Sequence, residues 1–419
     1  MDFFILNFSI YDIILKVKKY FFLGGISMWV KKRHRVFIAI VKPFFKLYLK
    51  IKYKFSYDKP ISVPEGSIIL SNHATTLDPI MISCLFKQHV YYMASKDIFN
   101  HRIIGRLLRF WLNPIPKEKS KKSDLNAIKS CMKVAKENGN IGIFPEGNRT
   151  FSGELGNVDY SIVKLVKTLK KPLIICNIEG GYPTDPRWGL TIRKGKVQAS
   201  IKKIYSYDEI KDLSNDDLYK LILDGLRVDD YNYYPEYKGK KLAEHLEKIF
   251  YICPVCGSMH TISTSDNMIY CSSCGLEVKH LPSLSFKANN ERFKFKNVSE
   301  WYKWQIEVIK NKEYNYNEVI YQDEVGLYLS RPFKKKELIS FGMMKLYNDR
   351  FSFENSEGLK EFFFNEVIAI TLVGKKKMNI YIGDTTYQVF NTPKTNLLKY
   401  MHLYYVIKNI GTDNEFLGL

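Results

Sequence analysis

Residues 68–78 read Ile-Ile-Leu-Ser-Asn-His-Ala-Thr-Thr-Leu-Asp, an apolar run that leads into a His and an Asp five positions apart. The apolar run predicts a buried strand, which delivers His73 into the loop that follows it. Histidine can take a proton from a hydroxyl near neutral pH, and a carboxylate on its other ring nitrogen helps it do so. Asp78 is the candidate carboxylate. The alternative is that Asp78-Pro79 is a plain helix cap with proline in the first turn.

A second loop follows another apolar strand, where residues 144–150 read Phe-Pro-Glu-Gly-Asn-Arg-Thr. Pro145 and Gly147 favour a turn, and Gly147 lets the backbone approach a ligand closely. Arg149 offers a fork of donors for phosphate oxygens, and Glu146 orders either Arg149 or a substrate hydroxyl. The alternative is a Glu–Arg pair across a surface turn. A base with a carboxylate partner and a cationic clamp suits acyl transfer onto a phosphate-bearing alcohol.

The segments around these loops alternate between strand-like and helix-like patterns over residues 57–228. This alternation predicts an α/β domain, with a mixed sheet and flanking helices. The expected strands are residues 67–71, 90–94, 141–144, 173–178 and 195–204. The expected helices are residues 79–85, 103–111, 123–138 and 160–169.

Both loops resemble motifs of a known family. Asn72-His73 with Asp78 matches the NHxxxxD motif, and residues 144–150 resemble the FPEGTRS motif, of the 1-acylglycerol-3-phosphate acyltransferase (lysophospholipid acyltransferase) family. Shorter blocks at residues 94–99, 113–119 and 172–175 follow the same order, and the resemblance covers about 40% of the chain. Lys119 stands where the family usually has Arg, which alters the phosphate pocket.

The resemblance implies that His73 deprotonates the free hydroxyl of a lysophospholipid while Asp78 orients it. The alkoxide would attack the thioester of acyl-CoA or acyl carrier protein, without a metal or a covalent enzyme intermediate. The acceptor would be 1-acylglycerol-3-phosphate, giving phosphatidic acid. Its binding residues would be Glu146, Gly147, Arg149, Lys119 and Asn72. The alternatives are another lysophospholipid or hydroxyl acceptor, or a non-catalytic membrane or nucleic-acid-binding scaffold.

Residues 1–56 are rich in basic and aromatic side chains, which predicts amphipathic helices at a membrane interface. Cations recur every four positions, with apolar side chains opposite them: Lys42, Lys46, Lys50 and Lys54 against Ile40, Phe44, Leu47, Tyr48 and Ile51. Pro43 is expected to kink this segment or to start its second helix. The alternative is a helix packed on the core with a solvated Lys face. Met28 follows Gly24-Gly25-Ile26-Ser27, and two adjacent glycine codons can form a purine-rich ribosome-binding site. We therefore hypothesise that translation naturally starts at Met28 and not at Met1.

Charge and composition constrain the partners. The 419 residues carry 64 Lys and Arg against 43 Asp and Glu, a net charge of +21, which suits phospholipid headgroups, a phosphorylated substrate or nucleic acid. The alternative is the Lys excess of an AT-rich genome. The sequence contains no run of eighteen uninterrupted apolar residues, so we predict no membrane-spanning helix. We expect a peripheral or monotopic protein on the cytoplasmic face of the cell membrane.

Four cysteines form two CxxC pairs in residues 229–283, which we interpret as a linker and a zinc ribbon. Each pair is followed by glycine, and fourteen residues separate them: Cys253, Cys256, Cys271 and Cys274. This pattern predicts a structural, tetrahedral zinc site. The alternative, two disulfides, conflicts with the lack of a secretory signal. Zinc ribbons also bind nucleic acid, but this segment is not notably basic, which argues against that partner.

Residues 284–419 predict a β-rich domain with a terminal helix. An amphipathic helix is expected over residues 299–311, and Thr392-Pro393 is expected to cap a final helix over residues 394–409. Between them, short strand-like runs are expected at residues 325–329, 344–346, 350–353, 361–364, 368–373, 378–382 and 387–389. Many strands and one closing helix suggest a small barrel or sandwich resembling a pleckstrin-homology-like domain.

Overall fold

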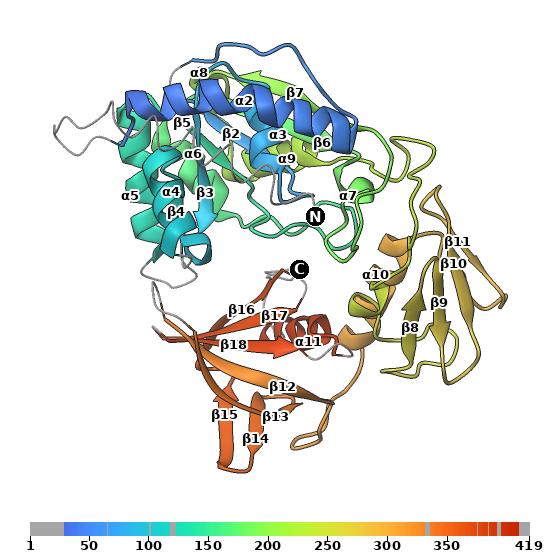
Figure 1. The fold of residues 1–419 in the computed structure, drawn as a ribbon. Helices are drawn as coiled ribbons and strands as arrows, with labels where there is room; N and C mark the ends of the chain where they lie inside the picture. The colour runs from blue at the N-terminus through green and yellow to red at the C-terminus, as the bar shows by residue number, and fades with distance from the viewer. Residues whose placement is uncertain are drawn as a thin grey trace.

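The computed structural model describes residues 29–64, 66–99, 102–117, 123–331, 336–374, 376–383, 385–391 and 395–409. Three sheets organise this part of the chain, as Figure 1 shows. The predicted helices before residue 29, the candidate start at Met28 and the predicted ligand Lys119 lie outside the described residues.

The first sheet is mixed, as predicted. Its strands are β1 (Phe55–Tyr57), β2 (Ile68–Ser71), β3 (Val90–Ser95), β4 (Ile115–Lys117), β5 (Asn140–Ile143), β6 (Leu173–Glu179) and β7 (Val197–Tyr205). They lie in the order β1-β7-β6-β2-β5-β3-β4, and only the β6–β7 pairing is antiparallel. Leu70 pairs with Ile143, so the loops after β2 and β5 leave the sheet at the same edge.

Helices cover both faces of this sheet, because its central strands carry apolar side chains on both faces. Ile68 and Leu70 belong to one core cluster, whereas Ile69 belongs to another. The helical segments are α2 (Lys32–Tyr53), α3 (Asp78–Ser83), η2 (Lys96–Phe99), α4 (Arg102–Trp111), α5 (Ser123–Lys136), α6 (Ser161–Leu169), α7 (Gly181–Thr184), α8 (Tyr207–Ile210) and α9 (Asn215–Leu226). α5, α6 and α9 supply the first cluster, and α2 and α3 supply the second.

Helix α2 lies across the top of this sheet in Figure 1. It continues through Pro43 as one helix. The predicted start of a second helix at Pro43 is therefore wrong. Proline removes the hydrogen bond to the carbonyl four residues earlier, which belongs to Ala39 on the exposed face, where water can replace the lost donor. Among the described helices, none is both long and apolar enough to cross a bilayer.

The second sheet is antiparallel, in the order β11-β10-β9-β8. Its strands are β8 (Ile262–Ser265), β9 (Met268–Cys271), β10 (Glu277–His280) and β11 (Phe286–Ala288), preceded by η3 (Leu246–Lys248) and followed by α10 (Val298–Lys310). Trp301 of α10 is fully buried and stacks on Phe250 with a centroid distance of 3.9 Å. This small sheet therefore packs against α10 and shares a hydrophobic cluster with the third sheet.

The third sheet confirms the β-rich C-terminal region. Its strands are β12 (Tyr321–Ser330), β13 (Glu337–Leu346), β14 (Arg350–Asn355), β15 (Gly358–Phe363), β16 (Val367–Val373), β17 (Lys377–Ile382) and β18 (Thr385–Asn391). They lie in the order β15-β14-β13-β12-β18-β17-β16, all antiparallel, so β12 and β18 join two meanders. The likeness to a pleckstrin-homology-like domain stays a prediction.

The last helix, α11 (Leu398–Lys408), starts later than the predicted residue 394. The expected cap, Thr392-Pro393, lies outside the described residues. Asn396 Oδ1 accepts hydrogen bonds from the N–H groups of Leu398 and Lys399 instead, at 2.9 and 3.3 Å. Residues 398–406 are all buried, so α11 is enclosed on all sides and forms part of the hydrophobic core.

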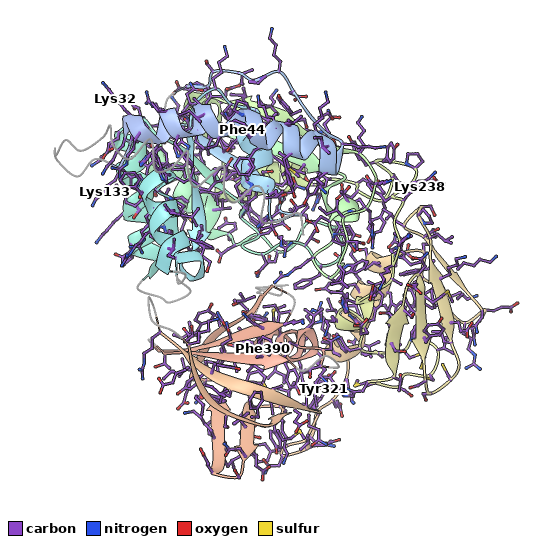
Figure 2. All side chains as sticks on the ribbon, in the orientation of Figure 1. Lys32, Phe44, Lys133, Lys238, Tyr321 and Phe390 are labelled. Carbon is purple, nitrogen blue, oxygen red and sulfur yellow. The ribbon has the colours of Figure 1, made fainter. Side chains whose placement is uncertain are left out.

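Side chains link the first sheet's domain to the C-terminal half, and Figure 2 draws the side chains of both parts as sticks. Glu154 accepts hydrogen bonds from Ser299 and Lys303 of α10. Arg187 Nη2 donates to the carbonyl of Leu372, the penultimate residue of β16, at 2.6 Å. The predicted domain boundaries at residues 56, 228 and 283 stay predictions.

Candidate active site

The loop after β2 brings His73 and Asp78 together. His73 Nδ1 lies 2.7 Å from Asp78 Oδ2, and the His73 side chain is 20% exposed whereas that of Asp78 is 0% exposed. An ionised carboxylate only accepts hydrogen bonds, so Nδ1 carries the proton and Nε2 is left as the ring's acceptor. This is the geometry of a general base with an orienting carboxylate.

Further donors converge on Asp78. The N–H of Ala74 donates to Oδ2 at 2.6 Å, and the N–H of Thr75 donates to Oδ2 at 2.9 Å. The hydroxyl of Thr75 donates to Oδ1 at 2.6 Å. Leu77, not Asp78, is the N-cap of α3, so the alternative of a plain Asp78 cap is wrong. The carboxylate instead accepts hydrogen bonds from the loop that precedes it and holds the ring of His73 in place.

Asn72 anchors this loop to the neighbouring strand β6. Its Nδ2 donates to the carbonyl of Ile178 at 2.9 Å, and its Oδ1 accepts from the N–H of Ile178 at 2.8 Å. The residue is buried, and both of its polar groups are engaged with backbone. Asn72 is therefore a positioning residue, and its predicted contact with substrate stays a prediction.

Glu146 ties the two motif loops together. Its Oε1 accepts from the N–H of His73 at 2.7 Å, and its Oε2 accepts from the N–H of Gly156 at 2.8 Å. Burial raises the pKa of Glu146 to about 8, although the two N–H donors act in the opposite direction. The expected ordering of Arg149 by Glu146 does not occur through either of these bonds, so Glu146 positions the loop that carries the base.

Two further contacts hold the second loop against His73. The N–H of Thr150 donates to the carbonyl of His73 at 2.9 Å. The Phe144 ring stacks on the His73 ring, with a centroid distance of 4.5 Å and an interplanar angle of 26°. Phe144 thus supports the imidazole on one face while Asp78 holds its edge, which leaves little freedom for the ring to turn.

The turn at residues 144–147 forms as predicted, with the N–H of Gly147 donating to the carbonyl of Phe144 at 3.0 Å. Gly147 has a φ of 66°, and a Cβ built on it would meet no atom within 4 Å. The backbone at this position is exposed and unobstructed. Its predicted role, the close approach of backbone to a ligand, stays a prediction.

The guanidinium of Arg187 lies beside the backbone of Arg149. The carbonyl of Arg149 accepts from Arg187 Nη1 at 3.2 Å, and Arg187 is only 4% exposed. Burial, and after it the charge of Arg149, lower the pKa of Arg187 to about 9. The two positive charges act on each other, which favours an anion near this end of the loop. The position of the Arg149 fork relative to a substrate stays a prediction.

The comparisons with known proteins find acyltransferases. Residues 53–179 match the family described as Acyltransferase. The chain is 29% identical over 139 residues to the 1-acyl-sn-glycerol-3-phosphate acyltransferase of Bacillus subtilis (strain 168), covering 32% of this chain. Residues 53–179 are an acyltransferase-family domain. The resemblance found in the motifs is thereby confirmed at the level of the family.

Each match covers only part of this chain and part of the related protein. The chain spans 65% of the length of the Bacillus subtilis relative. The crystal structure of the 1-acyl-sn-glycerophosphate (LPA) acyltransferase PlsC from Thermotoga maritima covers 47% of this chain and 82% of its own, at 16% identity and a TM-score of 0.39.

Several positioning residues of the acyltransferase domain were absent from the sequence predictions. Thr75 could have been found, because a Thr three residues before an Asp is a local hydrogen-bonding pattern. Gly156, Ile178 and Arg187 could not, because each meets its partner only through the fold. Arg187 lies 38 residues beyond Arg149 along the chain.

The four predicted cysteines gather at one point next to the second sheet. The sulfur atoms of Cys253, Cys256, Cys271 and Cys274 all lie within 4.8 Å of one another. Cys253 Sγ is 3.7 Å from Cys274 Sγ, and Cys256 Sγ is 3.8 Å from Cys271 Sγ, so no disulfide joins them. A tetrahedral zinc ion with Zn–S bonds of about 2.3 Å has S–S edges of about 3.8 Å. The cluster therefore fits a metal ion.

Proposed function

We propose that the acyltransferase domain transfers a fatty acyl group from an acyl thioester to the free hydroxyl of 1-acylglycerol-3-phosphate. The His73–Asp78 contact carries this proposal, because it engages Nδ1 with the carboxylate and leaves Nε2 directed away from it, where it can accept a proton. The family match and the name of the Bacillus subtilis relative support the choice of reaction and acceptor.

In the proposed reaction, Nε2 of His73 takes the proton of the acceptor hydroxyl while its oxygen attacks the thioester carbonyl. The new C–O bond forms as the C–S bond breaks, and the thiolate of coenzyme A or acyl carrier protein leaves. The leaving sulfur takes the proton from Nε2, so the imidazole returns to its starting state. Asp78 stabilises the transient imidazolium.

The phosphate of the acceptor is proposed to lie beside the second loop. The positive charges of Arg149 and Arg187, which act on each other, and the open backbone at Gly147 support this placement. Lys119 is proposed as a further phosphate ligand, on the motif resemblance alone.

A panel of lysophospholipids tests the proposal. Purified protein would be incubated with labelled acyl-CoA or acyl carrier protein and one acceptor at a time, and the products identified by mass spectrometry. We expect phosphatidic acid from 1-acylglycerol-3-phosphate at a rate well above that with lysophosphatidylcholine. A preference for another headgroup would reassign the acceptor. No product with any acceptor would favour a non-catalytic scaffold.

The cysteine cluster is proposed to hold one structural zinc ion. The fit of the sulfur spacing to a tetrahedron supports it, as do Gly257 and Gly275, whose φ values of 72° and 70° let each knuckle turn back on itself. Four thiolates would fill the coordination shell, so no catalytic step is assigned to the metal.

The protein is further proposed to act as a peripheral or monotopic protein at the cytoplasmic face of the membrane. An exposed apolar stripe on α2 supports this location: Val36, Ile40, Phe44, Leu47 and Ile51, which are 38% to 68% exposed. Such a stripe beside lysines is typical of a helix in a bilayer interface.

A further inference from the structure

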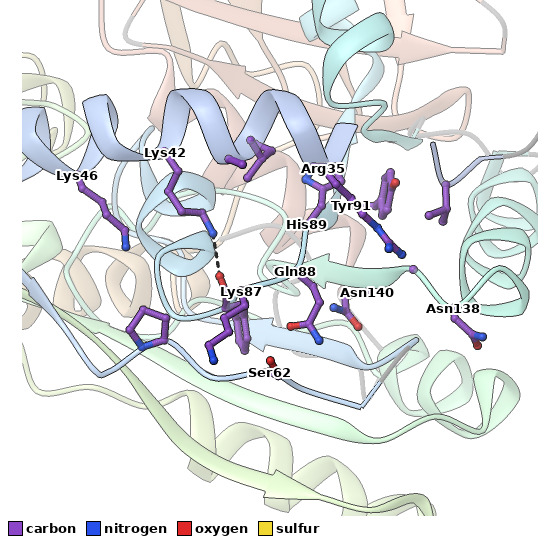
Figure 3. A pocket seen from close by; sticks show the side chains of 16 residues that line it. Arg35, Lys42, Lys46, Ser62, Lys87, Gln88, His89, Tyr91, Asn138 and Asn140 are labelled. Atoms are coloured by element: carbon purple, nitrogen blue, oxygen red, sulfur yellow. Dashed lines mark hydrogen bonds between the residues drawn. The ribbon is translucent and has the colours of Figure 1, made fainter. Parts of the chain in front are cut away.

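A cavity of about 450 Å³ lies beneath α2, and Figure 3 shows it from close by. Its lower wall comes from the segments that lead into β3 and β5, including Gln88 and Asn138. His73 and the second motif loop, by contrast, follow the far ends of β2 and β5. Because these strands are parallel, the cavity opens at the opposite edge of the sheet from the catalytic loops.

The cavity is lined by four cations. Arg35, Lys42 and Lys46 reach it from α2, and Lys87 reaches it from the segment before β3. None of its sixteen lining residues is an Asp or a Glu. A concave site with charges of one sign and low-dielectric walls concentrates ions of the opposite sign.

The fold holds these cations close together. Lys42 Nζ donates to the carbonyl of Phe86 at 2.7 Å, which fixes the ammonium at the cavity wall and leaves two further N–H donors. Burial lowers the pKa of Lys42, and the charge of Lys46 lowers it further. An anion in the cavity would relieve that repulsion.

Neutral donors complete the lining. Asn140 accepts the N–H of Ser67 with its Oδ1 at 3.1 Å, so its remaining polar group is the donating NH₂. Ser62 adds a hydroxyl to the same cavity. Cations together with neutral donors are the groups that bind phosphate oxygens.

The exposed stripe lies on the same helix as three of these cations. At 100° per residue, the apolar side chains at positions 36, 40, 44, 47 and 51 fall within an arc of about 80°, and Arg35, Lys42 and Lys46 lie about 80° to 120° beyond one edge of that arc. A molecule with a phosphate and acyl chains could therefore place the phosphate in the cavity and the chains along the stripe. Inorganic phosphate would use only the first of these.

We propose that the cavity beneath α2 binds the phosphate of an anionic phospholipid headgroup, at a site separate from the acyl acceptor site. The proposal does not depend on acyl transfer. It implies that the membrane supplies a bound lipid at the edge of the sheet remote from His73.

Binding of a short-chain lipid tests this. Calorimetry with dihexanoyl-phosphatidylglycerol, kept below its micelle concentration, avoids the general attraction of a charged bilayer. The test variant is Arg35→Gln/Lys46→Gln/Lys87→Gln, which spares Lys42. The control is Lys32→Gln/Lys50→Gln/Lys52→Gln, which removes the same charge from exposed positions of α2 outside the cavity.

We expect saturable binding that falls at least tenfold in the cavity variant and less than twofold in the control, while dihexanoyl-phosphatidylcholine binds at least tenfold more weakly. Equal losses in both variants would overturn the site. Inorganic phosphate that binds as tightly as the lipid would overturn the lipid assignment. If the triple variant fails to fold, Lys87→Glu at an exposed position must show the same loss.

Location is read out independently of affinity. A photoactivatable headgroup analogue of the same lipid is cross-linked to the full chain, and the modified peptides are identified by mass spectrometry. We expect labels within residues 35–46 or 85–91. Labels confined to residues 72–78 and 144–150 would mean that the lipid occupies the acceptor site, which contradicts the proposal but leaves acyl transfer intact.

Discussion

Asp78 has the most closely specified environment in the acyltransferase site, because four hydrogen-bond donors meet its carboxylate. Asp78→Asn would set an NH₂ group against backbone N–H groups and would no longer fix the proton on Nδ1 of His73. We expect kcat to fall by about 10²–10⁴-fold. We also expect the free energy of unfolding to fall by about 1–3 kcal/mol, measured by denaturant titration.

The matched control is Asp208→Asn, at an exposed position on α8. It should change neither quantity measurably. Near-normal acyl transfer by Asp78→Asn would reduce Asp78 to a structural loop residue.

Glu146 predicts a pH dependence of stability. Its pKa is raised from the usual 4.5 to about 8, so between these values the unfolded chain has released a proton that the folded protein retains. The contribution of Glu146 is therefore present in full below about pH 4.5 and is lost as pH rises toward 8. We expect the free energy of unfolding to fall over this range more steeply in the wild type than in Glu146→Gln. Equal slopes for the wild type and Glu146→Gln would show that the Glu146 carboxyl is already ionised in the folded protein over this pH range.

The chemistry at single positions was predictable where the partners are close in sequence. His73 and Asp78 share one loop, so their contact follows from a strand, a turn and a helix start. The role of Asn72 was not predictable, because Ile178 lies 106 residues away and engages only through its backbone. Glu146 was likewise predicted to contact substrate, because nothing in the sequence indicates that the backbone N–H of His73 donates a hydrogen bond to it.

At the scale of elements, α2 is the clearest case of an exposed apolar surface. Phe44 and Leu47 are 63% and 59% exposed, so Phe44→Ser/Leu47→Ser should change the free energy of unfolding by no more than about 1 kcal/mol. The binding of this double variant to phospholipid vesicles should weaken at least fivefold in a sedimentation assay. The reason is that the two lost side chains would otherwise lie in the membrane interface.

The control for this variant is Phe341→Ser/Leu359→Ser, on β13 and β15, whose side chains are 63% and 62% exposed. It removes side chains of the same kind and exposure from another part of the chain. If both variants lose vesicle binding equally, α2 has no special place at the membrane.

Most elements of the acyltransferase domain were predictable, because their apolar residues follow a clear period. Helix α9 was missed although Leu218, Ile222 and Leu226 recur every four residues and are all buried. That signal was present in the sequence. The short strands β1 and β4 carry no such signal, because three residues cannot display a period, and their pairing with β7 and β3 defines them.

At the scale of the whole molecule, the cysteine cluster couples the small sheet to the C-terminal half. Cys253 and Cys271 are buried in the same cluster as Trp301. Elemental analysis should find about one zinc per chain in the wild type. Cys271→Ser should lose this metal. It should also lower Tm by several degrees, because metal binding contributes to folding.

The control is Cys84→Ser, a buried cysteine of the acyltransferase domain that is remote from the cluster. It should keep the zinc. A wild-type protein with clearly less than one metal ion per chain, despite reduced thiols, would contradict the zinc site.

The organisation into an acyltransferase domain, a cysteine-rich segment and a β-rich region was readable from local motifs. How these parts meet was not, because the links are single contacts between distant positions. Arg187 reaches Leu372 across 185 residues, and Lys399 of α11 pairs with Asp323 of β12 inside the core. Such contacts depend on the placement of whole elements, which no local pattern specifies.

The central claim is that His73, held by Asp78, takes the proton of the acceptor hydroxyl. The most direct measurement is the single-turnover rate of acyl transfer from labelled acyl-CoA to 1-acylglycerol-3-phosphate by wild type and His73→Ala, under saturating acceptor. The account predicts phosphatidic acid from the wild type and a rate at least about 10²-fold lower from His73→Ala, with unchanged acceptor binding. Equal rates in the two proteins would contradict it.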